Sequence, residues 1–385
     1  MKSTSVFIFL FVCAICLLAP AAASAATLKY GAWLPYWSKQ SGANTFALNL
    51  DKFNEISPFS YEVNSNGSLI DSLKMTSGFW PTWVKAVQDS GIKVMPSIAI
   101  IDGDQIYSLL SNKTTRNNHI NNIVKLVKTN NYNGIDIDYE DKSAETRTYF
   151  DTFIKDLWMK LPWSKTLSCT LEPRMPLDSQ YAVIPKNIEY ANDYPVLNKY
   201  CDEIRIMAYD QGTIDLKLDA SKGKSDFYAP VADKDWVEKV IKETIKTINP
   251  KKIMLGIPTY GYEYEVTWND GVTTYKRLRS RTYTQAMDLA STVGATPQRN
   301  SAGELSFVYA SSTPVDVSKN LTYQIVSTTP PLGMIAQPQT TRFVDFSDAK
   351  AAEDKIALAK KYGLKGVFFF KMDGQTDPAI FSYLK

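Results

Sequence analysis

Eight short apolar runs recur along the chain, each followed by a longer helical or polar stretch. They are Tyr30–Trp37, Glu55–Tyr61, Lys93–Ile100, Tyr132–Glu140, Thr166–Leu171, Glu203–Asp210, Lys252–Tyr260 and Gly366–Phe370. Strands that alternate with helices form a parallel sheet covered by those helices, and eight such units are typical of a closed barrel. The sequence therefore predicts an α/β fold of the (β/α)8 TIM barrel type. A doubly wound open sheet is the alternative, but it usually has fewer strands and a glycine-rich first turn, which this chain lacks.

The intervals between these runs contain helical patterns and one irregular segment. We expect helices at Trp80–Ser90, Asn118–Lys128, Ala144–Lys160, Asp235–Ile248 and Asp348–Tyr362. The interval between the seventh and eighth runs is about 100 residues long, where about 40 would suffice. Within it, residues 263–344 contain β-like pieces at Tyr262–Trp268, Val272–Leu278, Leu305–Tyr309 and Leu321–Val326, a helical pattern at Tyr283–Val293, and turn signals at 269–271 and 330–331. This pattern predicts a small α+β insertion between strands seven and eight.

Residues 1–25 have the pattern of a secretory signal peptide. Lys2 gives a positive start, Val6–Leu18 is apolar, and Ala23–Ala25 offers small residues for cleavage. We therefore expect a mature chain of residues 26–385, secreted or held in the cell envelope, with no membrane contact beyond the signal peptide. An uncleaved anchor is the alternative interpretation.

Composition excludes several kinds of site. The net charge of the 385 residues is only +3, so no nucleic acid or other polyanion is implied as a partner. Outside the expected signal peptide the chain has one histidine and two cysteines, too few for a typical zinc site or a Ser-His-Asp triad. We expect neither metal nor cofactor, and a monomer. Cys169 and Cys201 could form a disulfide or remain buried thiols, and His119 is expected at the surface or at a helix end.

The fourth run carries three carboxyl groups at alternate positions, Asp136, Asp138 and Glu140. Alternate side chains of a strand share a face, so the three groups should lie close together. The apolar neighbours Ile135 and Ile137 indicate a strand covered on both faces. Crowding and burial raise the pKa of at least one such carboxyl, which then can act as a proton donor. A calcium site or a solvated acidic edge is the alternative.

Other runs also end in polar or aromatic side chains. In a barrel of this type the carboxyl ends of the strands meet at one rim, where functional groups gather. The groups at this rim come from Tyr36–Trp37, Glu172–Arg174, Tyr209–Gln211, Tyr260–Tyr262 and Lys371–Asp373. Each segment alone is more often packing than function, but their joint placement indicates a site.

Three of these segments resemble motifs of glycoside hydrolase family 18, the chitinase-like enzymes. Asn133–Glu140 is similar to the D-G-x-D-x-D-x-E strand of that family, Met207–Asp210 to its M-x-Y-D on strand six, and Leu255–Gly261 to its G-x-P-x-Y-G on strand seven. The motifs occur in the family's order and in register with the eight runs. The resemblance thus spans the mature chain and implies a catalytic barrel.

The resemblance implies a retaining mechanism in which the substrate supplies the nucleophile. Glu140 would protonate the glycosidic oxygen, Asp138 would orient the 2-acetamido group of the sugar, and Asp136 would share the proton load behind it. Tyr209 would bond the acetamido carbonyl, and Asp210 would contact the sugar or the same network. Groups expected to contact or stack on the sugar are Tyr36, Trp37, Met207, Tyr262, Trp268 and Phe370.

The implied substrate is a polysaccharide that contains N-acetylglucosamine, cleaved at β-1,4 bonds. Chitin, chitooligosaccharides, peptidoglycan and N-linked glycans all meet this requirement. The chain departs from the family pattern at Asn133, at Ser97–Ile100 and at Phe370, which stands where the family usually has tryptophan. A catalytically silent, lectin-like protein on the same barrel is the competing interpretation, although such relatives usually lose the acid that Glu140 supplies here. An envelope protein with an acidic metal site is the third.

Overall fold

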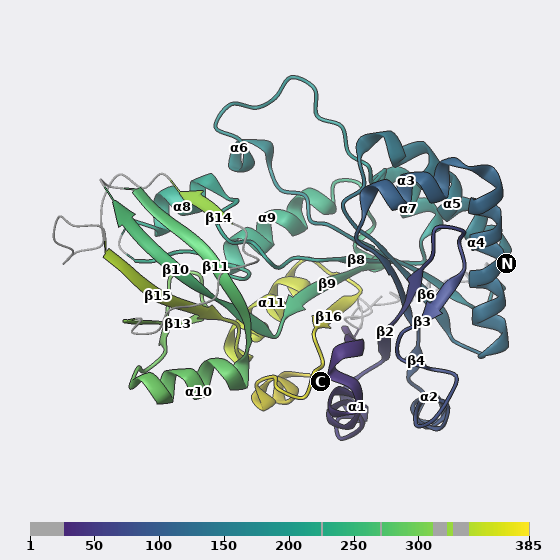
Figure 1. Ribbon diagram of the computed structural model, residues 1–385, viewed down its shortest axis with the longest axis horizontal. Helices are drawn as coiled ribbons and strands as arrows, with labels where there is room; N and C mark the ends of the chain where they lie inside the picture. The colour runs from purple at the N-terminus through teal and green to yellow at the C-terminus, as the bar shows by residue number, and fades with distance from the viewer. Residues whose placement is uncertain (1–26, 225, 270–271, 311–321, 326–338, 385) are drawn as a thin grey trace, which may run out of the picture.

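A computed structural model describes residues 27–224, 226–269, 272–310, 322–325 and 339–384. Within these residues, parallel strands form a barrel of eight strands in the order β1-β16-β9-β8-β7-β6-β5-β2 (Figure 1). The pairing of β1 with β2 closes the barrel. The strands are β1 Lys29–Pro35, β2 Glu55–Val63, β5 Ser97–Ile100, β6 Gly134–Tyr139, β7 Thr166–Leu171, β8 Glu203–Ile206, β9 Ile253–Pro258 and β16 Gly366–Phe370. The prediction of a (β/α)8 barrel is confirmed. The expected signal peptide lies outside the described residues.

Six of the predicted strands differ in extent from those observed, among them the third, the sixth and the seventh. The third is split into β4 (Lys93–Val94) and β5, because Pro96 between them has no N–H for the sheet ladder. The sixth ends at Ile206 rather than at Asp210, and the seventh ends at Pro258. The last residues of β2 pair with β3 (Leu69–Asp71) and form an antiparallel hairpin.

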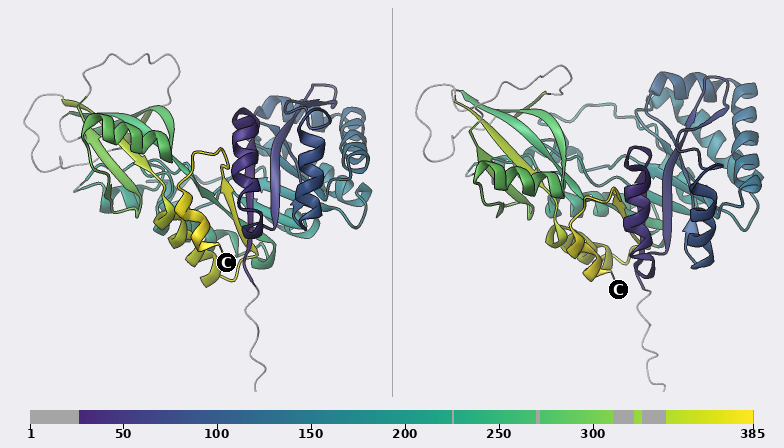
Figure 2. Two further views of the ribbon diagram at one scale, coloured as in Figure 1. Left: turned by 90° about the horizontal axis from the view of Figure 1, so that it is seen from below. Right: turned by 60° about the horizontal axis from the view of Figure 1, so that its bottom comes forward.

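Helices surround the strands on the outside (Figure 2). They are α1 Lys39–Ala47, α2 Trp80–Asp89, α3 Gly103–Ser111, α4 Lys113–Thr129, α5 Arg147–Lys160, α6 Leu177–Gln180, α7 Tyr194–Tyr200, α8 Leu216–Lys222, α9 Lys234–Thr244 and α11 Ala349–Lys361, with short 3-10 turns at Tyr36–Ser38, Leu50–Lys52, Ala144–Thr146, Pro250–Lys252 and Pro378–Tyr383. The five expected helices are present. α4 begins earlier than expected because Asn112 accepts hydrogen bonds from the backbone N–H of Thr114 and Thr115 and caps it.

The insertion forms a second sheet beside the barrel, on the left in Figure 1. Its strands are antiparallel, in the order β12-β13-β15-β10-β11-β14. The elements are β10 Tyr260–Asn269, β11 Val272–Thr282, α10 Tyr283–Val293, β12 Gln298–Arg299, β13 Leu305–Tyr309, β14 Thr322–Ile325 and β15 Gln339–Phe346. The α+β insertion is confirmed, and it starts at Tyr260, two residues after β9 ends. Most of the predicted turn signals, at 270–271 and 330–331, lie outside the described residues.

Two buried features fix the packing of the barrel. α5 buries Phe150, Phe153, Ile154 and Leu157, the i, i+3, i+4, i+7 spacing of one helical face. Cys169 on β7 and Cys201 before β8 are joined by a disulfide, with their Cα atoms 6.1 Å apart. The loop that the disulfide closes spans 32 residues, and closing a loop of that size stabilises a fold by about 3–4 kcal/mol in the chain-entropy account.

His119 is not at the surface, and the expectation of a surface or capping residue is wrong. Its side chain is buried inside the layer between α4 and β6. One ring nitrogen, Nδ1, lies 2.9 Å from the carbonyl oxygen of Gly67, and the other contacts the hydroxyl of Tyr139. Because a carbonyl can only accept, Nδ1 carries the proton and Nε2 accepts from Tyr139. The histidine thus connects the β2–β3 hairpin to the strand that carries the acidic motif.

Candidate active site

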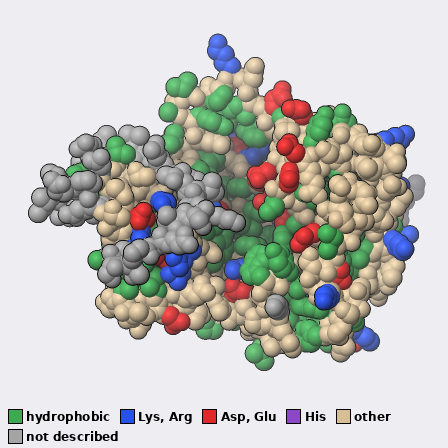
Figure 3. All heavy atoms as spheres, viewed as in Figure 1, with side chains coloured by type: hydrophobic (Ala, Val, Ile, Leu, Met, Phe, Trp, Pro, Cys, Tyr) green, Lys and Arg blue, Asp and Glu red, His purple; other side chains and the backbone are tan. Residues whose placement is uncertain are grey.

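A cavity of about 760 Å³ opens at the carboxyl ends of the barrel strands. Figure 3 shows acidic side chains along one rim of the hollow in this face and hydrophobic side chains over its floor. Residues that line it include Trp33, Tyr36, Trp37, Phe59, Glu62, Asp102, Asp138, Glu140, Glu172, Met207, Tyr209, Asp210 and Phe370. They come from the ends of seven of the eight barrel strands, because parallel strands deliver their last residues to one edge.

Asp136 lies below this cavity, in the interior of the barrel. Its Oδ2 accepts hydrogen bonds from Trp33 Nε1 (3.1 Å) and Ser97 Oγ (2.7 Å), and its Oδ1 accepts one from Thr170 Oγ1 (2.9 Å). Arg205 Nη1 lies 3.1 Å from the same Oδ2. Four other strands of the barrel, β1, β5, β7 and β8, therefore each contribute a donor to this one carboxylate, which anchors the middle of β6.

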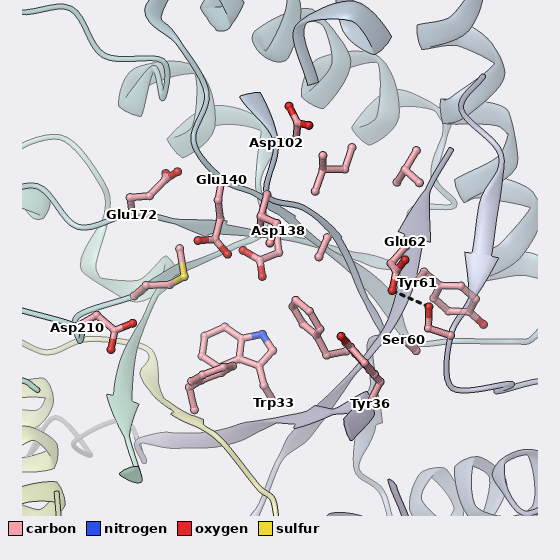
Figure 4. A pocket seen from close by; sticks show the side chains of 18 of the residues that line it. Trp33, Tyr36, Ser60, Tyr61, Glu62, Asp102, Asp138, Glu140, Glu172 and Asp210 are labelled. Atoms are coloured by element: carbon pink, nitrogen blue, oxygen red, sulfur yellow. Dashed lines mark hydrogen bonds between the residues drawn. The ribbon is translucent and has the colours of Figure 1, made fainter. Parts of the chain in front are cut away.

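Asp138 and Glu140 are the next two carboxyls along the chain, and both line the cavity (Figure 4). Burial, followed by the charges of Glu140 and Asp136, raises the pKa of Asp138 well above its usual value. One oxygen of Asp138, Oδ1, is buried and has no hydrogen-bond partner within the described protein. Burial and then the charge of Glu172 raise the pKa of Glu140 to about 7. Both pKa values are raised first by burial and then by neighbouring carboxylates, the two causes that the crowded and buried strand predicts.

Asp210, four residues after the end of β8, also lines the cavity, and Figure 4 shows it to the left of Glu140 and Asp138. Its Oδ1 accepts hydrogen bonds from the hydroxyls of Tyr260 and Tyr262, the latter at 2.7 Å. Burial raises the pKa of Asp210, and the two tyrosine hydroxyls oppose that rise. Asp210 has a left-handed backbone (φ 60°), which turns the chain sharply and directs this carboxyl to the cavity wall.

Aromatic rings form the floor and one rim of the cavity. Phe370 stacks on Tyr209 with ring centres 5.4 Å apart and an interplanar angle of 15°, and Trp33 meets Phe370 edge-on at 6.0 Å. Tyr36 and Trp37, at the rim after β1, are 41% and 47% exposed. Exposed rings with an apolar face and a polar edge are well suited to stack on sugars.

The structure brings eight of the eleven predicted site residues to the cavity, namely Glu140, Asp138, Tyr209, Asp210, Tyr36, Trp37, Met207 and Phe370. The other three do not line it. Asp136 lies beneath, and the ring of Tyr262 is buried behind Asp210, whose position it fixes. Trp268 lies six residues farther along β10, opposite Thr273 and Gln339, a strand length of about 20 Å from Tyr262. Neither Tyr262 nor Trp268 offers a face to a sugar in this cavity.

Three residues of the site were not singled out from the sequence. Trp33 lies in the middle of a strand and looks like core, Arg205 sits in an apolar run, and Glu172 was noted only as part of a strand end. Trp33 lines the floor of the cavity and donates a hydrogen bond to Asp136. Arg205 forms an ion pair with Asp136. An arginine inside an otherwise apolar strand could have been noticed, since a buried cation needs an anionic partner.

Among the described residues, no group of three or more His, Cys, Asp or Glu side chains is arranged to hold a metal ion. In the same residues, no helix is both long enough and apolar enough to cross a bilayer.

The profile of "Glycosyl hydrolases family 18" matches residues 32–375 of the chain. The chain belongs to this family. The prediction of a chitinase-like glycoside hydrolase is thereby confirmed at the level of the family.

Several family 18 proteins are similar to this chain. The "Uncharacterized glycosylase YvbX" of Bacillus subtilis is 25% identical over 279 residues, which are 72% of this chain and 67% of the relative. The "Cortical fragment-lytic enzyme" of Bacillus anthracis is 23% identical over 69% of this chain and 52% of the relative. The chain thus spans about half to two thirds of the length of these relatives.

Solved structures share the fold. The spore cortex-lytic enzyme SleL of Bacillus cereus superposes with a TM-score of 0.70 at 20% identity, over 93% of this chain and 74% of SleL. A chitinase of Chromobacterium violaceum has a TM-score of 0.68 at 18% identity, over 93% of this chain and 98% of that one. At these identities the likeness shows the fold alone.

Proposed function

We propose that this family 18 protein hydrolyses β-1,4 bonds in glycans that contain N-acetylglucosamine, with retention of configuration and with help from the substrate. The observation that carries the proposal is the pairing of Glu140, which holds a proton up to a pH of about 7, with Asp138, whose buried Oδ1 lacks a partner in the cavity wall. A proton donor next to a vacant acceptor suits a sugar whose leaving oxygen takes a proton while its amide N–H gives a hydrogen bond.

In the first step Glu140 donates its proton to the glycosidic oxygen as the bond from that oxygen to the anomeric carbon breaks. The carbonyl oxygen of the 2-acetamido group attacks the anomeric carbon, and an oxazolinium ion forms. Asp138 accepts the amide N–H through Oδ1 and offsets the positive charge that develops on the ring nitrogen. Preorganised charge of this kind, in a site shielded from water, is usually the largest single contribution to the rate.

In the second step water attacks the anomeric carbon from the face that the leaving group vacated. Glu140, now a carboxylate, takes the proton from that water and returns to its starting state. The oxazolinium ring opens and regenerates the acetamido group. Tyr209 and Asp210 lie across the cavity from Glu140 and would orient the same sugar, with Phe370 and Trp33 beneath its ring.

Asp136 has a supporting role in this scheme. Its two oxygens are occupied by donors from Trp33, Ser97, Thr170 and Arg205, so it fixes β6 and adds negative charge below Asp138. That charge is one of the causes, after burial and Glu140, that raise the pKa of Asp138.

The substrate class includes chitin, chitooligosaccharides and peptidoglycan. Relatives are named as chitinases and as enzymes that lyse cortical fragments, and both names refer to polymers with N-acetylglucosamine. We further propose that residues 1–25 direct export, so that the protein meets such polymers as a monomer outside the cytoplasm.

The test is an assay of the purified protein on N-acetylglucosamine oligomers, peptidoglycan and glycopeptides side by side. NMR of the first products should show the β anomer. Replacing the acetamido group at the scissile unit by trifluoroacetamido should slow cleavage, because fluorine makes the carbonyl oxygen a poorer nucleophile. Inverted products, or equal rates with both amides, would rule out the mechanism. Tight binding with no turnover on all three substrates would instead identify a lectin-like protein.

A further inference from the structure

The turn that follows β6 is held from two sides at the residue after Glu140. Glu172, which follows β7, accepts a hydrogen bond from the backbone N–H of Asp141 at 3.1 Å. On the other side, Gly103 at the start of α3 packs so closely that a Cβ there would be 2.2 Å from the carbonyl oxygen of Asp141. Asp141 itself has a left-handed backbone (φ 58°), a conformation that a residue other than glycine keeps only when its surroundings hold it.

Glu172 is itself held in place. Its second oxygen, Oε2, accepts a hydrogen bond from Asn192 Nδ2 at 2.7 Å. Arg174, two residues farther along the chain, lies between the rings of Tyr190 and Tyr194, at 3.9 Å and 3.7 Å from their centres, and contacts the carbonyl of Asn192. The long connection between β7 and α7 is therefore tied to the residue that holds the turn after Glu140.

A buried lysine completes the arrangement. The side chain of Lys142 is 1% exposed, its Nζ lies 3.9 Å from Glu172 Oε1 and it donates to the carbonyl of Tyr139. Burial lowers the pKa of Lys142, and the surrounding carboxyls oppose that change. Glu172 and Lys142 thus place charges of opposite sign beside one carboxyl, Glu140.

We propose that Glu172 is a positioning residue for Glu140: it fixes the turn after β6 and, opposed by Lys142, sets the pH range over which Glu140 keeps its proton. The proposal rests on the role of Glu140 given above and names a residue that acts through it.

Other charged groups also face Glu140 or the turn behind it. Asp141 and Asp210 raise its pKa together with Glu172, while Lys142 lowers it. The remaining titratable groups around it are Asp136, Asp138, Tyr209 and the α3 cap Asp102. Among the charges, Glu172 contributes the largest rise and Lys142 the opposing fall. Removing the charge of Glu172 and removing the charge of Lys142 should therefore shift the pKa of Glu140 in opposite directions.

The experiment measures kcat/KM against pH on 4-nitrophenyl N,N'-diacetylchitobioside. Activity requires the protonated acid, so the wild type should decline above a pH of about 7. In Glu172→Gln, which keeps an acceptor for Asp141 but loses the charge, the alkaline midpoint should fall by about 0.5–1 pH unit. In Lys142→Met it should rise. Glu145→Gln, the same change on an exposed residue of the same connection, should leave it in place.

A further variant separates position from charge. Glu172→Ala loses the acceptor as well, so it should show the same midpoint as Glu172→Gln and a kcat several-fold lower at the optimum. Midpoints that stay fixed in both Glu172 variants, or that move in the same direction in Glu172→Gln and Lys142→Met, would overturn the proposal.

A second readout does not need activity. Because the folded pKa of Glu140 exceeds its unfolded value, the stability that Glu140 adds relative to Glu140→Gln is full below about pH 4.5 and disappears as the pH rises through about 7. Glu172→Gln lowers the folded pKa of Glu140. In a Glu172→Gln background this stability contribution of Glu140 should therefore disappear at a lower pH. If that shift occurs in a protein without glycosidase activity, the charge relation stands and the proposed function fails.

Discussion

Two groups of carboxyls lie one above the other in the same barrel, and only the lower group has its negative charge matched by cations. The lower cluster consists of Glu55, Asp136, Glu203, Arg205 and Lys365. Burial alone would raise the pKa of Glu203, but Arg205 and Lys365 bring it below its usual value. Burial and the charge of Glu203 raise the pKa of Glu55 to about 8, so that it holds a proton at neutral pH. Two cations thus face two anions and one neutral acid.

The pocket carboxyls, Asp138, Glu140, Glu172 and Asp210, have no such balance. Lys142 is the cation that lowers the pKa of Glu140 and of Asp138, and it is outnumbered. Asp136 and Asp138 are two residues apart on one strand, yet one is surrounded by donors and the other is left with a vacant oxygen. The comparison teaches that the neighbours supplied by other strands, and not the residue type, decide whether a carboxyl supports the fold or does chemistry.

The largest effect should come from removing Glu140, the proposed proton donor. Glu140→Gln keeps the volume and loses the acid, so kcat/KM should fall by about 10²- to 10⁴-fold, the range of general acid catalysis. The unfolding midpoint at pH 7 should change little. Steady-state assays with calorimetry on the same samples check both, and a variant with near-normal turnover would contradict the role of Glu140.

The lower cluster should respond in stability. Arg205→Met leaves Asp136 and Glu203 without their shared buried cation. Removing one partner of a buried ion pair costs about 3–5 kcal/mol. Urea denaturation measures this loss. A matched change at an exposed pair, Lys85→Met opposite Asp89, should cost under about 1 kcal/mol. An Arg205→Met variant as stable as the wild type would mean that the cluster is not balanced as described.

Asp138→Asn should separate rate from stability at the pocket. The rate should fall by about 10²- to 10³-fold, as when one preorganised group is lost. Because the pKa of Asp138 is raised in the folded state, its own contribution to stability declines as the pH rises above the unfolded value. The asparagine variant should therefore be as stable as the wild type or more stable at pH 7, and lose that advantage below about pH 4. Thermal unfolding of both proteins across this pH range measures the difference in stability. An asparagine variant that is less stable than the wild type at pH 7 would contradict the prediction.

The smallest effect should come from trimming the shell around Asp136. Ser97→Ala removes one of its three side-chain hydrogen bonds from uncharged donors and should cost about 1.5–3 kcal/mol of unfolding free energy, the range for bonds to a charged group. Because Trp33, Thr170 and Arg205 remain, kcat should change less than threefold. A rate loss similar to that of Asp138→Asn would show that the lower cluster and the pocket carboxyls do not act independently.

The eight strands could be predicted because each is a short apolar run in a regular alternation, and the acidic strand because its carboxyls recur every second residue. β15 was not identified, since Gln339–Phe346 has no clear alternation and is paired on both sides by strands distant in sequence. Trp268 was assigned to the sugar because it is aromatic and near a motif, but the length of β10 carries it away. Trp33 and Glu172 were missed as site residues because their roles depend on which strands become neighbours, which sequence spacing does not give.

The single histidine, His119, makes the stability of the fold depend on acidity. Burial lowers the pKa of His119 to about 4, although its contact with the Gly67 carbonyl works in the other direction. A folded pKa below the unfolded one means that the neutral ring supports the fold above about pH 6.5 and that this support is withdrawn as acidity increases toward pH 4. Its partner Tyr139 stands between Asp138 and Glu140. In an acidified medium Glu140 is therefore protonated first, and the strand that carries it loses the support of the neutral His119 ring only at lower pH.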